Sequence, residues 1–406
     1  MYQNAALLAL FLLIYSAVAG RVERSWISGP IVFTSVGLLL GPVGLNILHL
    51  NVTTEGLRIL AELTLAMVLF TDAANADLGT VRHYVNLPGR LLLIGLPLTI
   101  VLGFLLAAVM FPLLDILEMA LLAAILAPTD AALGMPVVTN REVPAPIREA
   151  LNLESGLNDG LCVPVVVILL GLAVGTQIEG GTMMHMARVV TEEIGIGLAI
   201  GLAMTGCAAL MLRMAGNHGW TGANWLEVPV VALAAACFAA AQAMGGSGFI
   251  ACFVGGLMLN QLRGSVGAPV MEGAESIGET LALLTWIVFG AAVIGPMIGR
   301  FTWAALLYAV LSLTVIRMLP VYLCLSRTGM SMAEKLFMGW FGPRGLASIV
   351  FAIIVFNARL PGNDTVLAVI VITVLLSVVA LGVTANFLLR SMRFGDPVPM
   401  PRHGPQ

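Results

Sequence analysis

The sequence is short of charge. Only 10% of its 406 residues are Asp, Glu, Lys or Arg, whereas 59% are hydrophobic, and the mean hydropathy is +1.01. Soluble domains carry about 25% charged residues, so 19 basic and 22 acidic side chains cannot cover the surface of a soluble protein of this length. Apolar segments recur from Ala5 to Leu389, and no polar stretch is long enough to form a separate domain. The composition therefore predicts a chain that lies in a lipid bilayer along nearly its whole length.

The low net charge and the few cysteines exclude two kinds of binding site. The formal net charge is −3, which excludes the basic surface that binds nucleic acid. The 5 cysteines stand singly in apolar runs, without a CxxC pair or a spacing that would hold a metal. They are expected to be small packing residues. We therefore expect no resident cofactor and no nucleic-acid partner.

Apolar runs bounded by charges or by Gly and Pro turns predict thirteen membrane helices. They cover residues 4–20, 27–48, 57–78, 88–112, 116–138, 147–174, 190–213, 226–243, 246–262, 276–299, 302–325, 334–357 and 364–391. With the N-terminus outside, thirteen basic residues lie in inner loops and the C-terminal tail, and four lie in outer loops. Cytoplasmic loops hold an excess of Lys and Arg. The split favours an odd number of helices and a cytoplasmic C-terminus.

The two halves of the sequence repeat each other. Matched pairs at offsets of 215 to 219 residues are Gly29 and Gly248, Gly37 and Gly256, Glu62 and Glu279, Phe70 and Phe289, and Pro128 and Pro343. Seven helices separate equivalent positions, so the halves would be inverted in the membrane. Inverted repeats with broken helices in matching positions are typical of secondary transporters. We expect a first repeat over 1–174, a connector with helix 7 over 175–225, a second repeat over 226–392 and a short cytoplasmic tail over 393–406.

Six charged residues stand inside the predicted helices, away from a membrane surface. They are Asp72, Asp130, Glu154, Asp159, Arg317 and Arg344. A charge near the bilayer centre costs about 2.5–3.5 kcal/mol on insertion scales, so each is a candidate for function. Glu62 and Glu279, nearer their helix starts, are expected at the membrane interface.

Two of the predicted helices are broken by proline. The fifth carries Thr129 and Asp130 directly after Pro128, and the twelfth carries Gly342-Pro343-Arg344-Gly345. Proline removes main-chain hydrogen bonds, which frees carbonyl groups to face a cavity or an ion. Asp130 and Arg344 have the signs that would compensate the partial charges of half-helix ends. A purely structural role in neutralising those ends is the alternative for both.

The sixth helix carries a polar face. Residues four apart share a helix face, so Ser155 and Asp159 form one polar stripe, and Glu154 and Asn158 form its neighbour. Asp159 lies about twelve residues into its helix, near the midplane. A carboxylate there can hold a proton or a hard monovalent cation, but not both together. That exclusion is what coupled exchange requires.

Two other acidic residues have less direct roles. Glu154 needs a partner to stay buried, and the intramembrane cations available are Arg317 and Arg344. Asp72, in the third helix, either lines the approach to the site or lies at a helix end. The sequence leaves both choices open.

Taken together, these motifs resemble those of the monovalent cation:proton antiporters, in the branch of NhaP-type and animal sodium/proton exchangers. The resemblance covers nearly the whole chain and rests on four motifs in order: Thr129-Asp130, Glu154-Ser155 with Asn158-Asp159, Arg317-Met318-Leu319-Pro320, and Gly342-Pro343-Arg344-Gly345. It implies the sodium/proton antiporter fold, an all-α polytopic membrane protein with crossed discontinuous helices. It also implies a homodimer, with a scaffold of helices 1–3 and 8–10 and a moving core of helices 4–6 and 11–13.

The resemblance also implies roles for the site residues. Asp159 would bind the cation or the proton, with Asp130 as a second ligand of the monovalent metal ion and with help from Ser155 and the Thr129 main chain. Glu154 would pair with Arg317 and be steadied by Asn158. Electrogenic relatives have two aspartates where this chain has Asn158-Asp159, which implies electroneutral exchange of one cation for one proton.

We therefore expect a secondary transporter, not an enzyme, that exchanges Na⁺ for H⁺ by alternating access and serves pH homeostasis. Its partners would be small inorganic cations, protons, the lipid bilayer and a second copy of the chain. It would lie in the bacterial inner (plasma) membrane with its N-terminus outside. K⁺/H⁺ exchange is the alternative. A different class, an intramembrane aspartyl protease with Asp130 and Asp159 sharing a proton, leaves the repeat and Arg344 unexplained.

Overall fold

The computed structural model describes residues 2–22, 28–50, 55–76, 87–130, 133, 143–175, 183–220, 228–262 and 272–391. These residues form helices and connecting turns, without a strand among them. The predicted helix over 116–138 is described only to Asp130 and at Leu133. The tail over 393–406 and the loop arginines Arg24, Arg82, Arg141 and Arg263 lie outside the described residues.

Each predicted membrane helix overlaps helical structure. In the first half the elements are α1 (Tyr2–Val22), α2 (Gly29–Leu40), α3 (Glu55–Asn75), α5 (Pro88–Arg90), η1 (Leu91–Gly95), α6 (Leu96–Met110), α7 (Ile116–Ile125), α9 (Ala145–Gly175) and α10 (Met183–Asn217). In the second half they are α11 (Val228–Ala243), α12 (Gly248–Gln261), α13 (Glu272–Val288), η5 (Phe289–Ile294), α14 (Gly295–Met297), η6 (Ile298–Arg300), α15 (Trp303–Leu313), α16 (Val315–Cys324), α17 (Met332–Trp340), α18 (Leu346–Ala358) and α19 (Asn363–Ser391). Seven described stretches are long and apolar enough to cross a bilayer.

Two local predictions were wrong. The helix predicted over 27–48 ends at Leu40, because Gly41 is extended before Pro42, as residues before proline prefer. The helix predicted over 302–325 is interrupted at Thr314, whose hydroxyl donates to the carbonyl of Val310 at 2.7 Å, a bond that often bends helices. Glu62, whose place at the membrane interface stays a prediction, is buried among the helices and accepts a hydrogen bond from Arg58 one turn earlier.

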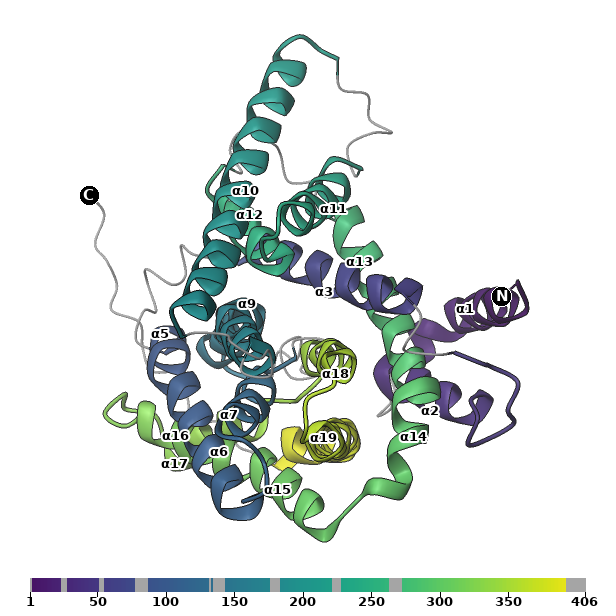
Figure 1. The fold of residues 1–406 in the computed structure, drawn as a ribbon, viewed down its shortest axis with the longest axis vertical. Helices are drawn as coiled ribbons and strands as arrows, with labels where there is room; N and C mark the ends of the chain where they lie inside the picture. The colour runs from purple at the N-terminus through teal and green to yellow at the C-terminus, as the bar shows by residue number, and fades with distance from the viewer. Residues whose placement is uncertain are drawn as a thin grey trace.

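The helices fall into two groups by their contacts. The site group contains α5 to α9 and α15 to α19; in it, α7 packs against α6 and α9, and α19 packs against α15 and α18. The flanking group contains α1 to α3 and α10 to η6; in it, α3 packs against α12 and α13. Figure 1 shows α9, α18 and α19 nearly end-on near the centre, with α3 crossing beside them. The groups meet where α3 contacts α9 and α18, where α10 and α12 contact α9, and where α2, α14 and η6 contact α19.

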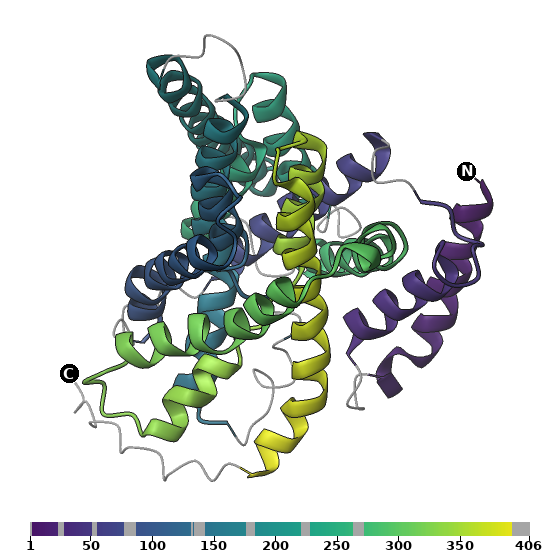
Figure 2. The ribbon, with the colours of Figure 1, turned by 60° about the horizontal axis from the view of Figure 1, so that its bottom comes forward.

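Helices α1 and α2 form one edge of the molecule in both views (Figures 1 and 2). Helix α1 packs on α2 through Phe11 and Tyr15, whose ring centroids lie 4.9 and 4.7 Å from that of Phe33. Helix α1 has no buried residue. Its remaining apolar surface is therefore available to lipid or to another chain.

The flanking group contains two reciprocal close contacts. A Cβ atom added at Gly37 of α2 would overlap the carbonyl oxygen of Ile287 in α13, and one added at Gly256 of α12 would overlap that of Phe70 in α3. Gly37 and Gly256 are a matched pair of the sequence repeat. Glycine is needed at both positions because the helix backbones approach too closely for any side chain.

Candidate functional site

Two broken stretches of chain cross at the centre of the site group. Helix α7 ends at Ile125, and the chain between α17 and α18 is non-helical over 341–345. The main-chain N–H of Asp130 donates to the carbonyl of Pro343 at 2.8 Å. The hydroxyl of Ser348 donates to the carbonyl of Ile125 at 2.8 Å. The two proline breaks, 215 residues apart in the sequence, therefore lie against each other.

Asp130 caps α18 from another part of the chain. Its Oδ2 accepts a hydrogen bond from the main-chain N–H of Leu346 at 2.7 Å, and its Oδ1 accepts one from Leu133 at 3.0 Å. The N–H groups of a first helical turn have no partner within the helix, and the helix dipole favours a negative charge there. A Cβ atom at Gly345 would overlap Oδ2 of Asp130, so this contact requires glycine.

Arg344 lies at the end of α7. Its Nη1 donates to the carbonyl oxygens of Ala127 at 3.0 Å and Pro128 at 3.1 Å. Its main-chain N–H donates to the hydroxyl of Ser377 in α19 at 2.7 Å. The residue is fully buried. The guanidinium thus binds two carbonyl groups of the broken stretch that directly follows α7 and places its positive charge near the C-terminal end of that helix.

The polar face of α9 is bonded to the broken stretch after α7. The side-chain amide of Asn158 donates to Oγ1 of Thr129 at 2.6 Å. Oγ1 of Thr129 and Oγ of Ser155 form a hydrogen bond at 3.1 Å. All three side chains are buried. The amide of Asn158 is therefore directed to Thr129, and not to the Glu154 carboxylate that it was expected to steady.

Asp159 lies one turn beyond Ser155 on the same helix and is 7% exposed. Among the described residues, no group donates a hydrogen bond to its carboxylate. The charged groups that act on it are the carboxylates of Asp130 and Asp72 and the guanidinium of Arg344. Asp159 is therefore a buried carboxylate whose acidic neighbours, Asp130 and Asp72, favour the binding of a positive charge.

Glu154 pairs with Arg317 of α16. Nη1 of Arg317 donates to Oε1 at 2.6 Å, and Nη2 donates to Oε2 at 2.7 Å. A Cβ atom at Gly342 would overlap Nε of Arg317, so the pair lies directly against the break before α18. Of the two intramembrane arginines that the sequence offered as partners, it is Arg317 that makes this contact.

Asp72 lies in the last turn of α3 and faces α9. Asp72 is half-buried. A Cβ atom added at Gly156 of α9 would lie 3.7 Å from the Cβ atom of Asp72. The carboxylates of Asp130, Glu275 and Glu279 act on it electrostatically. Asp72 therefore lies at a helix end, which is one of the two sequence alternatives, and that end lies beside the polar face of α9. A part in the approach to the site stays a prediction.

Three polar residues of this region were missed by the sequence reasoning, which followed charges. They are Ser348, Ser377 and Asn260, which bond to Ile125, to Arg344 and to the end of α3. For the two serines, a lone polar residue in an apolar run was the available signal, whereas Asn260 is followed directly by Gln261. Serine in a membrane helix often bonds to its own main chain, so that signal does not say which neighbour is bound.

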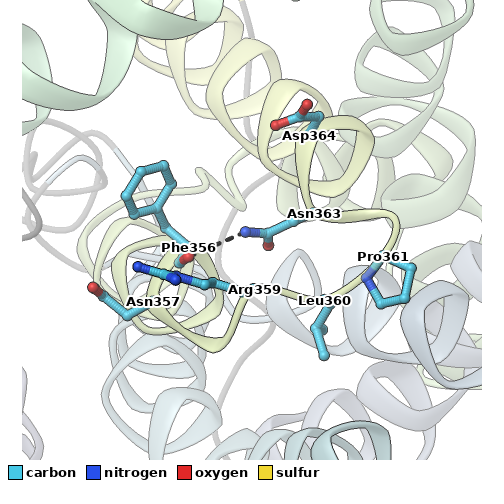
Figure 3. A pocket seen from close by; sticks show the side chains of 7 residues that line it. All are labelled: Phe356, Asn357, Arg359, Leu360, Pro361, Asn363 and Asp364. Atoms are coloured by element: carbon cyan, nitrogen blue, oxygen red, sulfur yellow. Dashed lines mark hydrogen bonds between the residues drawn. The ribbon is translucent and has the colours of Figure 1, made fainter. Parts of the chain in front are cut away.

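A separate cavity of about 430 Å³ opens at the far end of α18, lined by Phe356, Asn357, Arg359, Leu360, Pro361, Asn363 and Asp364 (Figure 3). The side-chain amide of Asn363 donates to the carbonyl of Phe356 at 3.1 Å across it. Asp130 caps the opposite end of α18. This cavity is therefore distinct from the crossing and contains none of the predicted site residues.

Comparison with known proteins agrees with this architecture. Residues 7–391 match the family described as sodium/hydrogen exchanger, transmembrane. The K⁺/H⁺ antiporter NhaP of Alkalimonas amylolytica is 24% identical over 400 residues, covering 97% of this chain and 68% of that protein. The K⁺/H⁺ antiporter NhaP2 of Shewanella sp. (strain ANA-3) is 25% identical, covering 98% of this chain and 68% of that protein. A probable Na⁺/H⁺ antiporter of Schizosaccharomyces pombe is 23% identical, covering 85% of this chain and 47% of that protein.

A solved structure has the same fold. It is that of the sodium proton antiporter MjNhaP1 from Methanocaldococcus jannaschii, with a TM-score of 0.76 and 21% sequence identity, covering 96% of this chain and 98% of that one. The likeness shows the antiporter fold, and the family match extends over nearly the whole chain. The chain therefore belongs to the sodium/hydrogen exchanger family of transmembrane proteins.

Proposed function

We propose that this cation:proton antiporter exchanges one Na⁺ for one H⁺ across the bacterial plasma membrane, and that Asp159 carries both ions in turn. The observation that carries the proposal is the setting of Asp159: a buried carboxylate beside the crossed breaks, with no hydrogen-bond donor among the described residues and two acidic neighbours. A bound cation or a bound proton neutralises it equally well. The two ions therefore compete for one site.

Oxygen atoms around Asp159 would complete the cation site. The Ser155 hydroxyl lies one turn away on α9, and Thr129 is bonded to it. Both oxygens of Asp130 already accept main-chain hydrogen bonds, but each carboxylate oxygen has a further lone pair. A hard cation prefers such carboxylate, hydroxyl and carbonyl ligands. Asp130 would thus supply negative charge to the ion while it holds the start of α18.

One-for-one exchange follows from the charge of the α9 face. Asn158 is neutral, and its amide is used by Thr129. Glu154 is neutralised by Arg317. Asp159 is then the carboxylate of this face that is free to change its charge. One proton leaves for each Na⁺ that binds, so the loaded site has the same charge in both half-cycles.

Alternating access would come from movement of the site group against the flanking group. We assign the flanking group to the scaffold and the site group to the moving core that the sequence resemblance implied. The reciprocal glycine contacts of α2 and α12 support the inverted repeats over 1–174 and 226–392 with a connector between them. We further propose an outside N-terminus, a cytoplasmic C-terminus and a homodimer. These follow from the loop charges and from the family.

K⁺/H⁺ exchange is the second candidate. The curated relatives from Alkalimonas and Shewanella are named K⁺/H⁺ antiporters, whereas the family and the matching solved structure are named for sodium. Selectivity between the two ions depends on the size of the cavity and the number of coordinating oxygens. Ion flux, and not the position of Asp159, distinguishes these candidates.

The test is proton flux in proteoliposomes that contain the purified protein and a pH-sensitive dye. Na⁺, Li⁺ and K⁺ are added in turn, with and without an imposed membrane potential. We expect Na⁺ to release protons at a rate that does not change with potential. A response to K⁺ alone would select the second candidate, and no response to any cation would overturn the proposal. The Asp159→Asn variant should be inactive, while Glu192→Gln, which changes an exposed carboxylate of α10, should match the unchanged protein.

A further inference from the structure

One side-chain amide holds the end of α3. The Nδ2 atom of Asn260, in the last turn of α12, donates to the carbonyl oxygens of Ala74 at 2.8 Å and Ala76 at 2.6 Å. The carbonyl of Ala73 lies 3.4 Å away. The last carbonyl groups of a helix have no partner within it, and an amide has two N–H donors to offer. Asn260 therefore acts as a C-terminal cap that comes from a different helix.

The packing of α12 on α3 brings Asn260 to this position. At Gly256, one turn before Asn260, the two backbones are so close that a Cβ atom would overlap the carbonyl oxygen of Phe70. The pair is thus joined at two successive turns, first by backbone contact and then by the amide. This leaves the end of α3 little freedom to shift relative to α12.

The end of α3 that Asn260 holds carries Asp72. Asp72 lies two residues before Ala74 and faces Gly156 of α9. A Cβ atom added at Gly156 would lie 3.7 Å from the Cβ atom of Asp72. Its charge acts on Asp159. A negative side chain at this point raises the local concentration of cations beside the site. A shift of the last turn of α3 would move that charge away from α9.

We propose that Asn260 is a positioning residue for cation entry: it holds the last turn of α3 so that Asp72 faces α9 on the path to Asp159. Asn260 does not touch the ion. The inference rests on the proposed function, because it assigns Asp72 to the path by which cations reach the carrier carboxylate. In the proposed orientation, that path opens at the cytoplasmic face.

The alternative is that Asn260 only stabilises the α3–α12 pair. A stability role would lower the amount of folded protein or the maximal rate, and it would not depend on Asp72 or on the side from which the cation arrives. A positioning role changes the KM for the cation at one face and disappears once Asp72 has lost its charge. The KM at each face and its dependence on Asp72 therefore distinguish a positioning role from a stability role.

The experiment measures the KM for Na⁺ separately at each face, in inside-out and right-side-out vesicles, for Asn260→Ala, Asp72→Asn and the double variant. We expect Asn260→Ala to raise the KM at the cytoplasmic face about five-fold, the loss associated with a hydrogen-bonded contact, and to change it less than two-fold at the other face. The double variant should match Asp72→Asn alone. Asn260→Gln, which keeps the amide, should restore most of the affinity.

The matched control is Asn357→Ala. Asn357 of α18 also donates its amide to a carbonyl, that of Ile353 at 2.8 Å, but within its own helix and away from α3, so the cytoplasmic KM should not change. Equal increases at both faces, or effects of Asn260→Ala and Asp72→Asn that multiply in the double variant, would overturn the inference. If Asn260→Ala does not accumulate in the membrane, Asn260→Ser provides the same comparison. Absence of exchange in the unchanged protein would overturn the proposed function first.

Discussion

Arg317 and Glu154 form a bidentate ion pair whose two side chains are each 1% exposed. The pair joins α16 to α9 directly beside the break before α18. Its charges cancel, so it adds no net charge to the field at Asp159. The fold depends on both members of the pair being present, because a buried charge that loses its partner is strongly destabilising.

Removing one member of this pair is therefore expected to destabilise the protein. Glu154→Gln leaves the guanidinium of Arg317 buried without a counter-charge, which costs about 3–5 kcal/mol. Thermal unfolding in detergent should show a large fall in Tm. The control is Glu192→Gln, which breaks the exposed pair of Glu192 with Arg188 and should cost less than about 1 kcal/mol. Equal losses for the two variants would contradict this reading.

Asp159 should bind Na⁺ and H⁺ in competition. Na⁺ binds the native state, so it should raise the Tm of the unchanged protein and have no effect on Asp159→Asn. Lowering the pH protonates the carboxylate, so the KM for Na⁺ should rise as the pH falls, approaching ten-fold per pH unit once the protonated form predominates. Flux measured at several pH values would show this. A KM independent of pH would mean that proton and cation use different groups.

Gly345 should tolerate no side chain. A Cβ atom there would overlap the carboxylate of Asp130 that caps α18. Overpacking of this kind costs about 1–3 kcal/mol, and the displaced carboxylate should also lower the exchange rate of Gly345→Ala. Gly56→Ala is the matched control, because no atom lies within 4 Å of the added Cβ. Normal exchange by Gly345→Ala, with normal stability, would show that the contact is not needed.

The ion pair of Arg300 with Asp364 should separate during transport. Arg300 ends η6 in the flanking group, and Asp364 lies in the first turn of α19 in the site group. Both side chains are exposed, so the pair itself contributes at most about 1 kcal/mol. A cross-link by a short bis-methanethiosulfonate reagent between Cys residues introduced at both positions should stop exchange, and reduction should restore it.

That cross-linking test is best made with the exposed Cys207 replaced by Ser. The control is the same cross-link between Cys residues at positions 188 and 192, one turn apart on α10, where no movement is expected. Full exchange by the protein cross-linked between positions 300 and 364 would exclude relative movement of the two groups at this end.

Two local sequence patterns predict helix ends that the hydropathy pattern does not predict. Helix α7 begins with a capping box of Asp115 and Glu118, and α17 begins with one of Ser331 and Glu334, 216 residues later. The capping box is a local pattern, so this further match between the halves needed no tertiary information. Pro42 likewise predicts the end of α2 at Leu40, because the residue before a proline disfavours the helical conformation.

The sequence by itself determined the membrane class, the helical segments, the two proline breaks and five of the charged residues that are buried: Asp130, Glu154, Asp159, Arg317 and Arg344. These follow from local chemistry: hydropathy decides what enters a bilayer, and proline removes a hydrogen bond wherever the chain goes. Only the tertiary structure decided that Glu154 pairs with Arg317, that Asp130 caps α18 while Arg344 binds the chain just after α7, and that Asn260 holds α3. Each of these contacts joins segments more than 160 residues apart. Which polar groups come within reach of one another depends on how the apolar helix faces pack, and many different apolar sequences would allow the same packing.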